Sequence, residues 1–210
     1  MIVAIDGPAG AGKSTVARRL AERLGFRYLD TGAMYRALTW LAMRDAIPLD
    51  EGGRLGRLAE QHLIGLDELG RVTIDGTDVT SAIRKSRIDR MVPVVARHPD
   101  VRRVMRERQR ELAEQCDSVM EGRDIGKVVV PEAEVKVYLI ADAEVRARRR
   151  VAERPDIGAD ALATDLRVRD ESDAARMEPA ADAIEIDTTH LEVEDVVARI
   201  EVLVRARTNA

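Results

Sequence analysis

The residues with the most specific chemistry lie near the start of the 210-residue chain, where positions 7–14 read GPAGAGKS. This segment fits the pattern G-x-x-x-x-G-K-[ST], in which glycines let backbone N–H groups converge on a phosphate. Lys13 would reach the β- and γ-phosphates, and the Ser14 hydroxyl would ligate Mg²⁺. The pattern predicts a site for a nucleoside triphosphate with Mg²⁺, made of these residues: Gly7, Pro8, Ala9, Gly10, Ala11, Gly12, Lys13, Ser14 and Thr15.

The surrounding elements favour this interpretation over a glycine turn before an ordinary helix. Residues 2–6 form a short apolar run, and Val16, Leu20 and Leu24 recur at helical spacing, which predicts strand, loop and helix. A phosphate loop alone leaves kinases, motor-type ATPases and regulatory switches open. The chain has one asparagine, Asn209, so it has no Asn-Lys-x-Asp motif with which common GTPases read guanine.

Two further clusters could bind the group that accepts the phosphate. Residues 30–36 (DTGAMYR) follow the first helix after a few positions. Residues 121–126 (EGRDIG) follow a predicted strand at 118–121, and α/β sheets bind ligands at such strand ends.

The remaining pattern alternates strands with helices, which predicts an α/β fold with a parallel sheet covered by helices on both faces. Apolar runs predict strands at 118–121, 135–141 and 183–187, and helical spacing predicts helices at 33–45, 54–63, 98–116, 142–153, 160–176 and 191–206. Residues 62–84 predict a small β-hairpin insert around Glu68-Leu69-Gly70, and residues 153–158 are a candidate hinge. Side chains expected in the core include Trp40, Tyr138 and Cys116.

Composition excludes several classes of function. The net charge of −4 gives no general attraction to nucleic acid or to anionic membranes. No apolar run approaches the ~18 residues of a membrane span, and the start, MIVAID, lacks the basic region of a signal peptide. A single cysteine excludes an intrachain disulfide. We therefore expect a cytoplasmic protein, monomeric by default, without nucleic-acid or membrane partners.

The chain resembles bacterial cytidylate kinases, which are nucleoside monophosphate kinases. The resemblance extends in order over nearly the whole length, in IDGPAGAGKST, YLDTGAMYRAL, DVTSAIR, ARHPDVR, EGRDIG, RVRDESDAAR and IDTTHL. It implies one P-loop kinase domain over residues 1–210, with a core of 1–60 and 97–210. It also implies a monophosphate-binding insert at about 61–96, a short lid at about 152–168, and transfer of the γ-phosphoryl group of MgATP to CMP or dCMP.

The resemblance also implies roles for several arginines. Arg36 and Arg123 would hold the CMP phosphate, and Arg176 would close on it from the end of the lid. Arg149 would approach the transferring phosphoryl group, so Lys13, Arg123 and Arg149 are the implied catalytic residues. Because all but four of the 34 basic residues are arginine, Arg149 could instead belong to a charged helix surface.

The base and the sugar would be recognised by a second implied set. Asp124 would accept a hydrogen bond from the cytosine amino group, with help from Thr31 and Arg102. Arg169 and Asp173, four residues apart on one helix face, would meet the ribose. The plainer alternatives are a surface pair or helix cap for Asp124, a helix-surface position for Arg102, and a simple ion pair of Arg169 with Asp173.

Two positions depart from the family pattern. Pro93 stands where the family has a serine near the sugar, and Lys127 follows GRDIG where the family favours threonine. Proline offers neither a hydroxyl nor an N–H, so the CMP over dCMP preference would be weakened or differently built. Two rival functions stay open: a sibling kinase acting on UMP or another small acceptor, and a nucleotide-regulated switch protein with little turnover.

Overall fold

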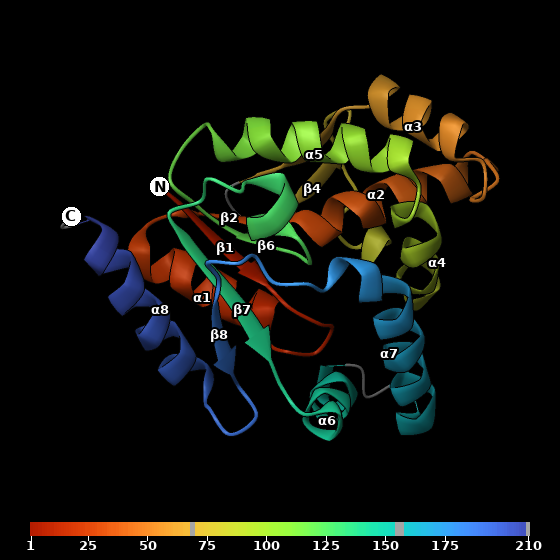
Figure 1. Cartoon of the computed structure of the whole chain (residues 1–210). Coiled ribbons are helices and arrows are strands. Elements are labelled where there is room, and N and C mark those ends of the chain that lie inside the picture. The colour runs from red at the N-terminus through yellow and green to blue at the C-terminus, as the bar shows by residue number, and fades with distance from the viewer. Residues whose placement is uncertain (68–69, 154–157, 209–210) are drawn as a thin grey trace. The chain divides into compact units, whose positions relative to one another are not determined.

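The structure is a computed structural model that describes residues 1–67, 70–153 and 158–208. Glu68 and Leu69 of the expected hairpin turn, and residues 154–157 of the candidate hinge and lid, lie outside the described residues. The chain divides into two compact units, one of Met1–Tyr28 with Cys116–Ala210 and one of Leu29–Gln115 (Figure 1).

The first unit is built on a parallel sheet. Its elements are β1 (Ile2–Asp6), α1 (Lys13–Leu24), β6 (Ser118–Glu121), η2 (Ile125–Val129, a π-helical turn), β7 (Val135–Ile140), α6 (Ala143–Glu153), α7 (Ala159–Asp173), η3 (Ala174–Arg176), β8 (Ile184–Asp187) and α8 (Val193–Thr208). The strand order is β2-β6-β1-β7-β8, and β1 pairs in parallel with both β6 and β7. The four strands expected from apolar runs, at 2–6, 118–121, 135–141 and 183–187, are therefore confirmed as β1, β6, β7 and β8.

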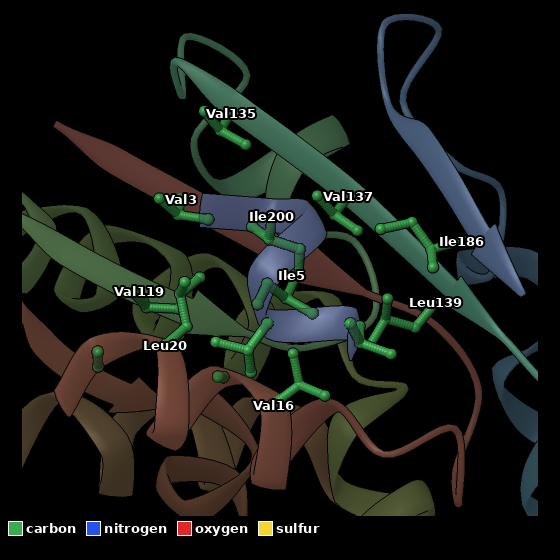
Figure 2. Close-up of a cluster of buried hydrophobic side chains, with 14 of the residues drawn as sticks. Val3, Ile5, Val16, Leu20, Val119, Val135, Val137, Leu139, Ile186 and Ile200 are labelled. Carbon is green, nitrogen blue, oxygen red and sulfur yellow. The ribbon is translucent and has the colours of Figure 1, made fainter. Parts of the chain in front are cut away.

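The core of this unit lies between one face of the sheet and two helices. Val3 and Ile5 of β1 alternate with residues that face the other side, and they contact Val16 and Leu20 of α1 and Ile200 of α8 (Figure 2). Leu20 is fully buried. Truncating such a leucine to alanine costs roughly 2–5 kcal/mol, because the lost contacts leave a cavity. This packing holds the ends of β1 and α1, and with them the phosphate loop, in place.

Glycine is required where the loop leaves β1. Gly7 has φ 142°, and a Cβ on it would lie 2.2 Å from the carbonyl oxygen of Leu139 on β7. No side chain fits at that distance, so the chain can pass this close to the sheet only as glycine. The requirement explains the first glycine of the motif independently of any ligand.

The second unit is mainly helical and carries a small separate sheet. Its elements are α2 (Thr31–Arg44), α3 (Gly52–Gln61), β3 (Ile64–Leu66), β4 (Val72–Ile74), β5 (Thr77–Asp78), η1 (Ala82–Arg84), α4 (Ser86–Ala96) and α5 (Pro99–Ala113). The expected hairpin at 62–84 is an antiparallel sheet of order β3-β4-β5. Pro93 lies inside α4, where it removes a helical N–H.

The structure corrects the element predictions at several points. It adds α4, which the sequence analysis did not assign, and β2 (Arg27–Asp30), which crosses the boundary between the units and is too short for its alternation to be recognised. The helix expected through Cys116 ends at Ala113, so Cys116 is exposed and is not a core residue. Trp40 is only half-buried, with the guanidinium of Arg44 over its ring.

Candidate active site

The phosphate loop connects β1 to the N-terminus of α1 and is stabilised by its own lysine. Lys13 is 5 % exposed, and its Nζ donates to the carbonyl oxygen of Pro8 at 2.7 Å. Burial, reinforced by the positive charge of Arg123, holds the pKa of Lys13 well below its ordinary value. Ser14 and Thr15 are exposed in the first turn of α1. A buried ammonium beside exposed hydroxyls at a helix N-terminus is suited to bind an anion.

Arg149 lies against the phosphate loop. Its Nη1 donates to Oγ1 of Thr188 at 3.0 Å and its Nη2 to the carbonyl oxygen of Thr188 at 2.6 Å. Thr188 in turn donates to the carbonyl oxygen of Ala11 at 3.2 Å, and a Cβ on Gly12 would lie 3.8 Å from Arg149 Nη1. The guanidinium is half-buried beside the loop. Arg149 therefore contacts the phosphate-loop region and does not simply belong to a charged, solvent-exposed helix surface.

A second arginine of α6, Arg146, also contacts the loop. Its Nη1 donates to the carbonyl oxygen of Ala9 at 3.1 Å and to Oδ2 of Asp170 on α7 at 2.7 Å. A Cβ on Gly10 would lie 3.0 Å from Cβ of Arg146, so the loop backbone packs directly on α6 at this point. Arg146 and Asp170 were not predicted as site residues, because nothing local distinguishes them from other charged residues of these helices.

Two buried carboxylates lie at the carboxyl ends of adjacent strands. Glu121 ends β6, is 5 % exposed, and accepts a hydrogen bond from the Tyr28 hydroxyl at 2.7 Å. Asp6 ends β1 and is 6 % exposed. Burial raises the pKa of Asp6 to about 6, against the opposing effect of two backbone N–H donors. The sequence pointed to Glu121 only as part of the cluster 121–126 and did not single out Asp6, although the convergence of parallel strand ends could have identified both.

Mg²⁺ prefers oxygen ligands and keeps several waters and phosphate oxygens in its coordination sphere. Ser14 offers an exposed hydroxyl oxygen and therefore fits this requirement. It lies in the first turn of α1, one residue after the buried Lys13.

Asp173 lies between two arginines. Its Oδ2 accepts from Arg123 Nε at 2.9 Å, and its Oδ1 accepts from Arg176 Nη2 at 2.7 Å. Burial would raise the pKa of Asp173, but the charges and hydrogen bonds of Arg123 and Arg176 outweigh it and hold that pKa below its ordinary value. Arg169, one turn earlier on α7, is near enough to Lys13 to lower the pKa of that lysine. The structure thus gathers these implied site residues within the first unit.

Asp124 begins the π-helical turn η2 and is 9 % exposed. Its carbonyl oxygen accepts from Val128 N at 2.9 Å, but its carboxylate makes no capping hydrogen bond to the turn. Asp124 is therefore neither a surface residue nor the helix cap that the plainer alternative predicted. Lys127, three residues later, is exposed and paired with Glu178 on the surface.

Three further residues of the implied site, Thr31, Arg36 and Arg102, lie in the second unit. Thr31 is 4 % exposed in the first turn of α2, which Asp30 caps by accepting from Ala33 N at 2.9 Å. Arg102 is half-buried on α5.

Arg36 is held by two carboxylates. Its Nε donates to Asp89 Oδ1 at 3.0 Å and its Nη1 to Asp30 Oδ1 at 3.5 Å. Asp89 lies on α4, and no local pattern in the sequence pointed to it. The two carboxylates orient a guanidinium that would otherwise sample many rotamers.

None of the helices in the described ranges is long and apolar enough to span a bilayer. Among solved structures, the fold is similar to a gluconokinase from Sinorhizobium meliloti 1021, with a TM-score of 0.56 over 99 % of this chain and 93 % of that one. At 16 % identity this likeness concerns the fold alone. It agrees with the predicted α/β fold of a P-loop kinase, which the parallel sheet flanked by helices confirms.

Sequence comparisons are more specific. The chain is 46 % identical to a cytidylate kinase of Shouchella clausii (strain KSM-K16), over 97 % of its own length and 95 % of that protein. It is 47 % identical to a cytidylate kinase of Geobacillus sp. (strain WCH70), over 98 % and 96 % of the two chains. The family model described as cytidylate kinase matches residues 3–206. With a phosphate loop backed by a buried lysine and arginines grouped beside it, the chain belongs to the cytidylate kinase family.

Proposed function

We propose that the protein transfers the γ-phosphoryl group of MgATP to CMP or dCMP, giving ADP and CDP or dCDP. The observation that carries the proposal is the match to the cytidylate kinase family over residues 3–206. The match agrees with the phosphate loop and with the arginines and aspartates in the described part of the chain. No comparable observation favours UMP as the preferred acceptor or a switch protein.

On the donor side, the loop Gly7–Thr15 binds the triphosphate, and Lys13 neutralises its β- and γ-phosphates. Binding of the polyanion would release Lys13 Nζ from the Pro8 carbonyl. The Ser14 hydroxyl would hold the Mg²⁺ that accompanies ATP, and the ion would neutralise charge that develops on the phosphate oxygens. Arg149, which donates a hydrogen bond to Thr188, would approach the transferring phosphoryl group.

On the acceptor side, the CMP phosphate is anionic at neutral pH and acts as its own nucleophile, so no general base is needed. The requirement is to hold two polyanions in line against their repulsion. Arg36, Arg123 and Arg176 are proposed for this task, since a guanidinium fork matches phosphate oxygens. Each guanidinium already has a carboxylate partner, Asp173 or Asp89, which keeps it oriented before the substrate arrives.

Base selection is assigned to Asp124. Cytosine presents an amino group at C4, where uracil presents a carbonyl that an ionised carboxylate cannot bind. Such a contact is worth roughly 1–3 kcal/mol of discrimination. Thr31 and Arg102 would assist at the base, and Arg169 and Asp173 would bind the ribose.

The domain assignment is likewise proposed. The core would comprise residues 1–60 and 97–210, the monophosphate-binding insert about 61–96, and the lid about 152–168. Within the described residues, the insert contains the antiparallel sheet and α4, and the lid contains the end of α6 and the first part of α7. We also propose that the protein acts as a cytoplasmic monomer, which its sedimentation behaviour would test.

The first experiment is ADP release from MgATP with CMP, dCMP, UMP, AMP and GMP supplied singly. We expect strong release with CMP and dCMP, weaker release with UMP and almost none with the purines. Release with another acceptor would keep the kinase and overturn the assignment of Asp124, Thr31 and Arg102. Binding of ATP without release for any acceptor would favour the switch protein.

A further inference from the structure

The turn that carries Asp124 is capped from another strand. A helical turn leaves its first N–H groups without partners inside the turn, and an aspartate at the capping position normally accepts one of them. Here the donors are Ile125 N and Gly126 N, and both bind the carboxylate of Asp6 at the end of β1. Ile125 N lies 2.8 Å from Asp6 Oδ1, and Gly126 N lies 2.8 Å from Oδ2.

The two carboxylates near this turn, Asp6 and Asp124, have different hydrogen-bonding roles. Asp124 occupies the capping position of the turn but makes no side-chain cap, because Asp6 performs that task from β1. The position of the turn relative to β1 is fixed further by Gly122 N, which donates to the carbonyl oxygen of Ile5 at 3.1 Å. Asp6 is bonded to the two residues that directly follow Asp124.

The chemistry of the pair favours an ionised Asp6. A carboxylate accepts on both oxygens without an O–H that competes as a donor, and bonds from backbone N–H groups to such an anion are among the stronger hydrogen bonds in proteins. With a pKa raised to about 6 by burial, Asp6 is ionised at neutral pH. The free-energy cost of this buried charge is partly offset by the two N–H donors, which is a reason to expect a function for it.

We propose that Asp6 is a positioning residue for base recognition, which holds the turn Ile125–Val129 so that the Asp124 carboxylate meets the base. The inference rests on the proposed function, since it takes Asp124 as the group that reads cytosine. It adds a link between the two halves of the reaction, because Asp6 also directly precedes Gly7 of the phosphate loop. Donor binding and base recognition thus share one rigid strand end.

The test is Asp6→Asn, which keeps the shape but places an NH₂ group against one of the two N–H donors. We expect kcat/KM for CMP to fall by about tenfold or more while KM for ATP changes by less than about threefold. Discrimination between CMP and UMP should shrink. Because the asparagine variant could fold poorly, Asp6→Ser is assayed beside it; its hydroxyl oxygen can accept from an N–H while its own O–H rotates away. This variant should shift the CMP to UMP ratio in the same direction.

The matched control is Glu134→Gln, which alters a carboxylate that accepts from Ile2 N at 2.7 Å at the opposite end of the same strand. This control should leave the CMP to UMP ratio unchanged.

A double-substitution cycle separates positioning from general destabilisation. If Asp6 acts through Asp124, Asp6→Asn should change the CMP to UMP ratio in the wild-type background and not in Asp124→Asn. A lower melting temperature with unchanged discrimination would overturn the inference, as would an equal effect in both backgrounds. Failure of the proposed function is recognised separately, because the wild-type protein itself would then not prefer CMP, and the inference would fall with it.

Discussion

Replacing Asp173 by asparagine removes the negative charge between the guanidinium groups of Arg123 and Arg176. Asp173 lies 2.9 Å from the first and 2.7 Å from the second. The side chains are 11 %, 21 % and 15 % exposed, so solvent screens these pairs only in part. The variant would leave two half-buried cations near each other with one neutral carbonyl oxygen to share.

The expected loss of stability follows from this burial. Breaking a buried ion pair by removing one partner costs roughly 3–5 kcal/mol. Asparagine keeps the shape and one acceptor, so we expect about 2–4 kcal/mol, or a fall in Tm of about 5–15 °C for a chain of this length. The control is Glu51→Gln, whose partner Arg54 lies 3.2 Å away, with both side chains about half exposed. A change at such a surface pair should cost no more than about 1 kcal/mol.

Two ligands should respond to Asp173→Asn in opposite directions. Inorganic phosphate should raise the Tm of the variant more than that of the wild type, because it supplies the missing negative charge to the two arginines. CMP should bind more weakly to the variant, because its ribose loses the proposed carboxylate partner. Thermal unfolding with graded phosphate, together with KM for CMP, measures both effects.

The pH dependence has a definite sign. The pKa of Asp173 is lower in the folded state than its ordinary value of 3.8. Its stabilisation is therefore fully present above that value and is lost as the pH falls through the folded pKa. The Tm difference between wild type and variant should persist from pH 5 to 8 and shrink below about pH 4. Equal Tm values at neutral pH, or equal stabilisation of both proteins by phosphate, would refute this reasoning.

Four further outcomes are expected. Asp124→Asn should lower CMP turnover and reduce discrimination against UMP by roughly 5- to 150-fold, measured as a ratio of kcat/KM values; intact discrimination would show that another group reads the base. Gly7→Ala should abolish ATP binding or folding, because its Cβ would lie 2.2 Å from the Leu139 carbonyl oxygen, and normal titration calorimetry with ATP would contradict that geometry. Pro93→Ser should shift the ratio of CMP to dCMP specificity constants, and an unchanged ratio would remove the idea that Pro93 alters sugar selection. The pKa of Asp6 is about 6 in the folded protein, against an ordinary value of 3.8. The folded state therefore favours the protonated carboxyl, and this contribution to stability is fully present below pH 3.8 and is lost as the pH rises through 6. Wild type should therefore lose about 3 kcal/mol relative to Asp6→Asn between pH 4 and 7, and parallel stability curves would count against it.

Local sequence was sufficient to predict the strand–loop–helix arrangement around the phosphate loop and most of the sheet. The spacing of glycines, Lys13 and Ser14 expresses a local loop conformation, and a run such as 135–140 is apolar on both parities because a parallel strand is covered on both faces. Shorter or atypical elements were not predicted from the sequence. Strand β2 has only four residues, and α4 contains a proline that a periodicity argument counts against a helix.

What only the tertiary structure decided is which charged residues meet. Asp6 binds Ile125 N across 119 positions, and Asp173 binds Arg123 across 50. The sequence offers 30 arginines and 38 acidic residues with little in their local patterns to select partners. Partner choice depends on the order β2-β6-β1-β7-β8, which brings the ends of distant strands together. Periodicity reports whether a segment is a strand or a helix, but strand order is set by the packing of the whole sheet.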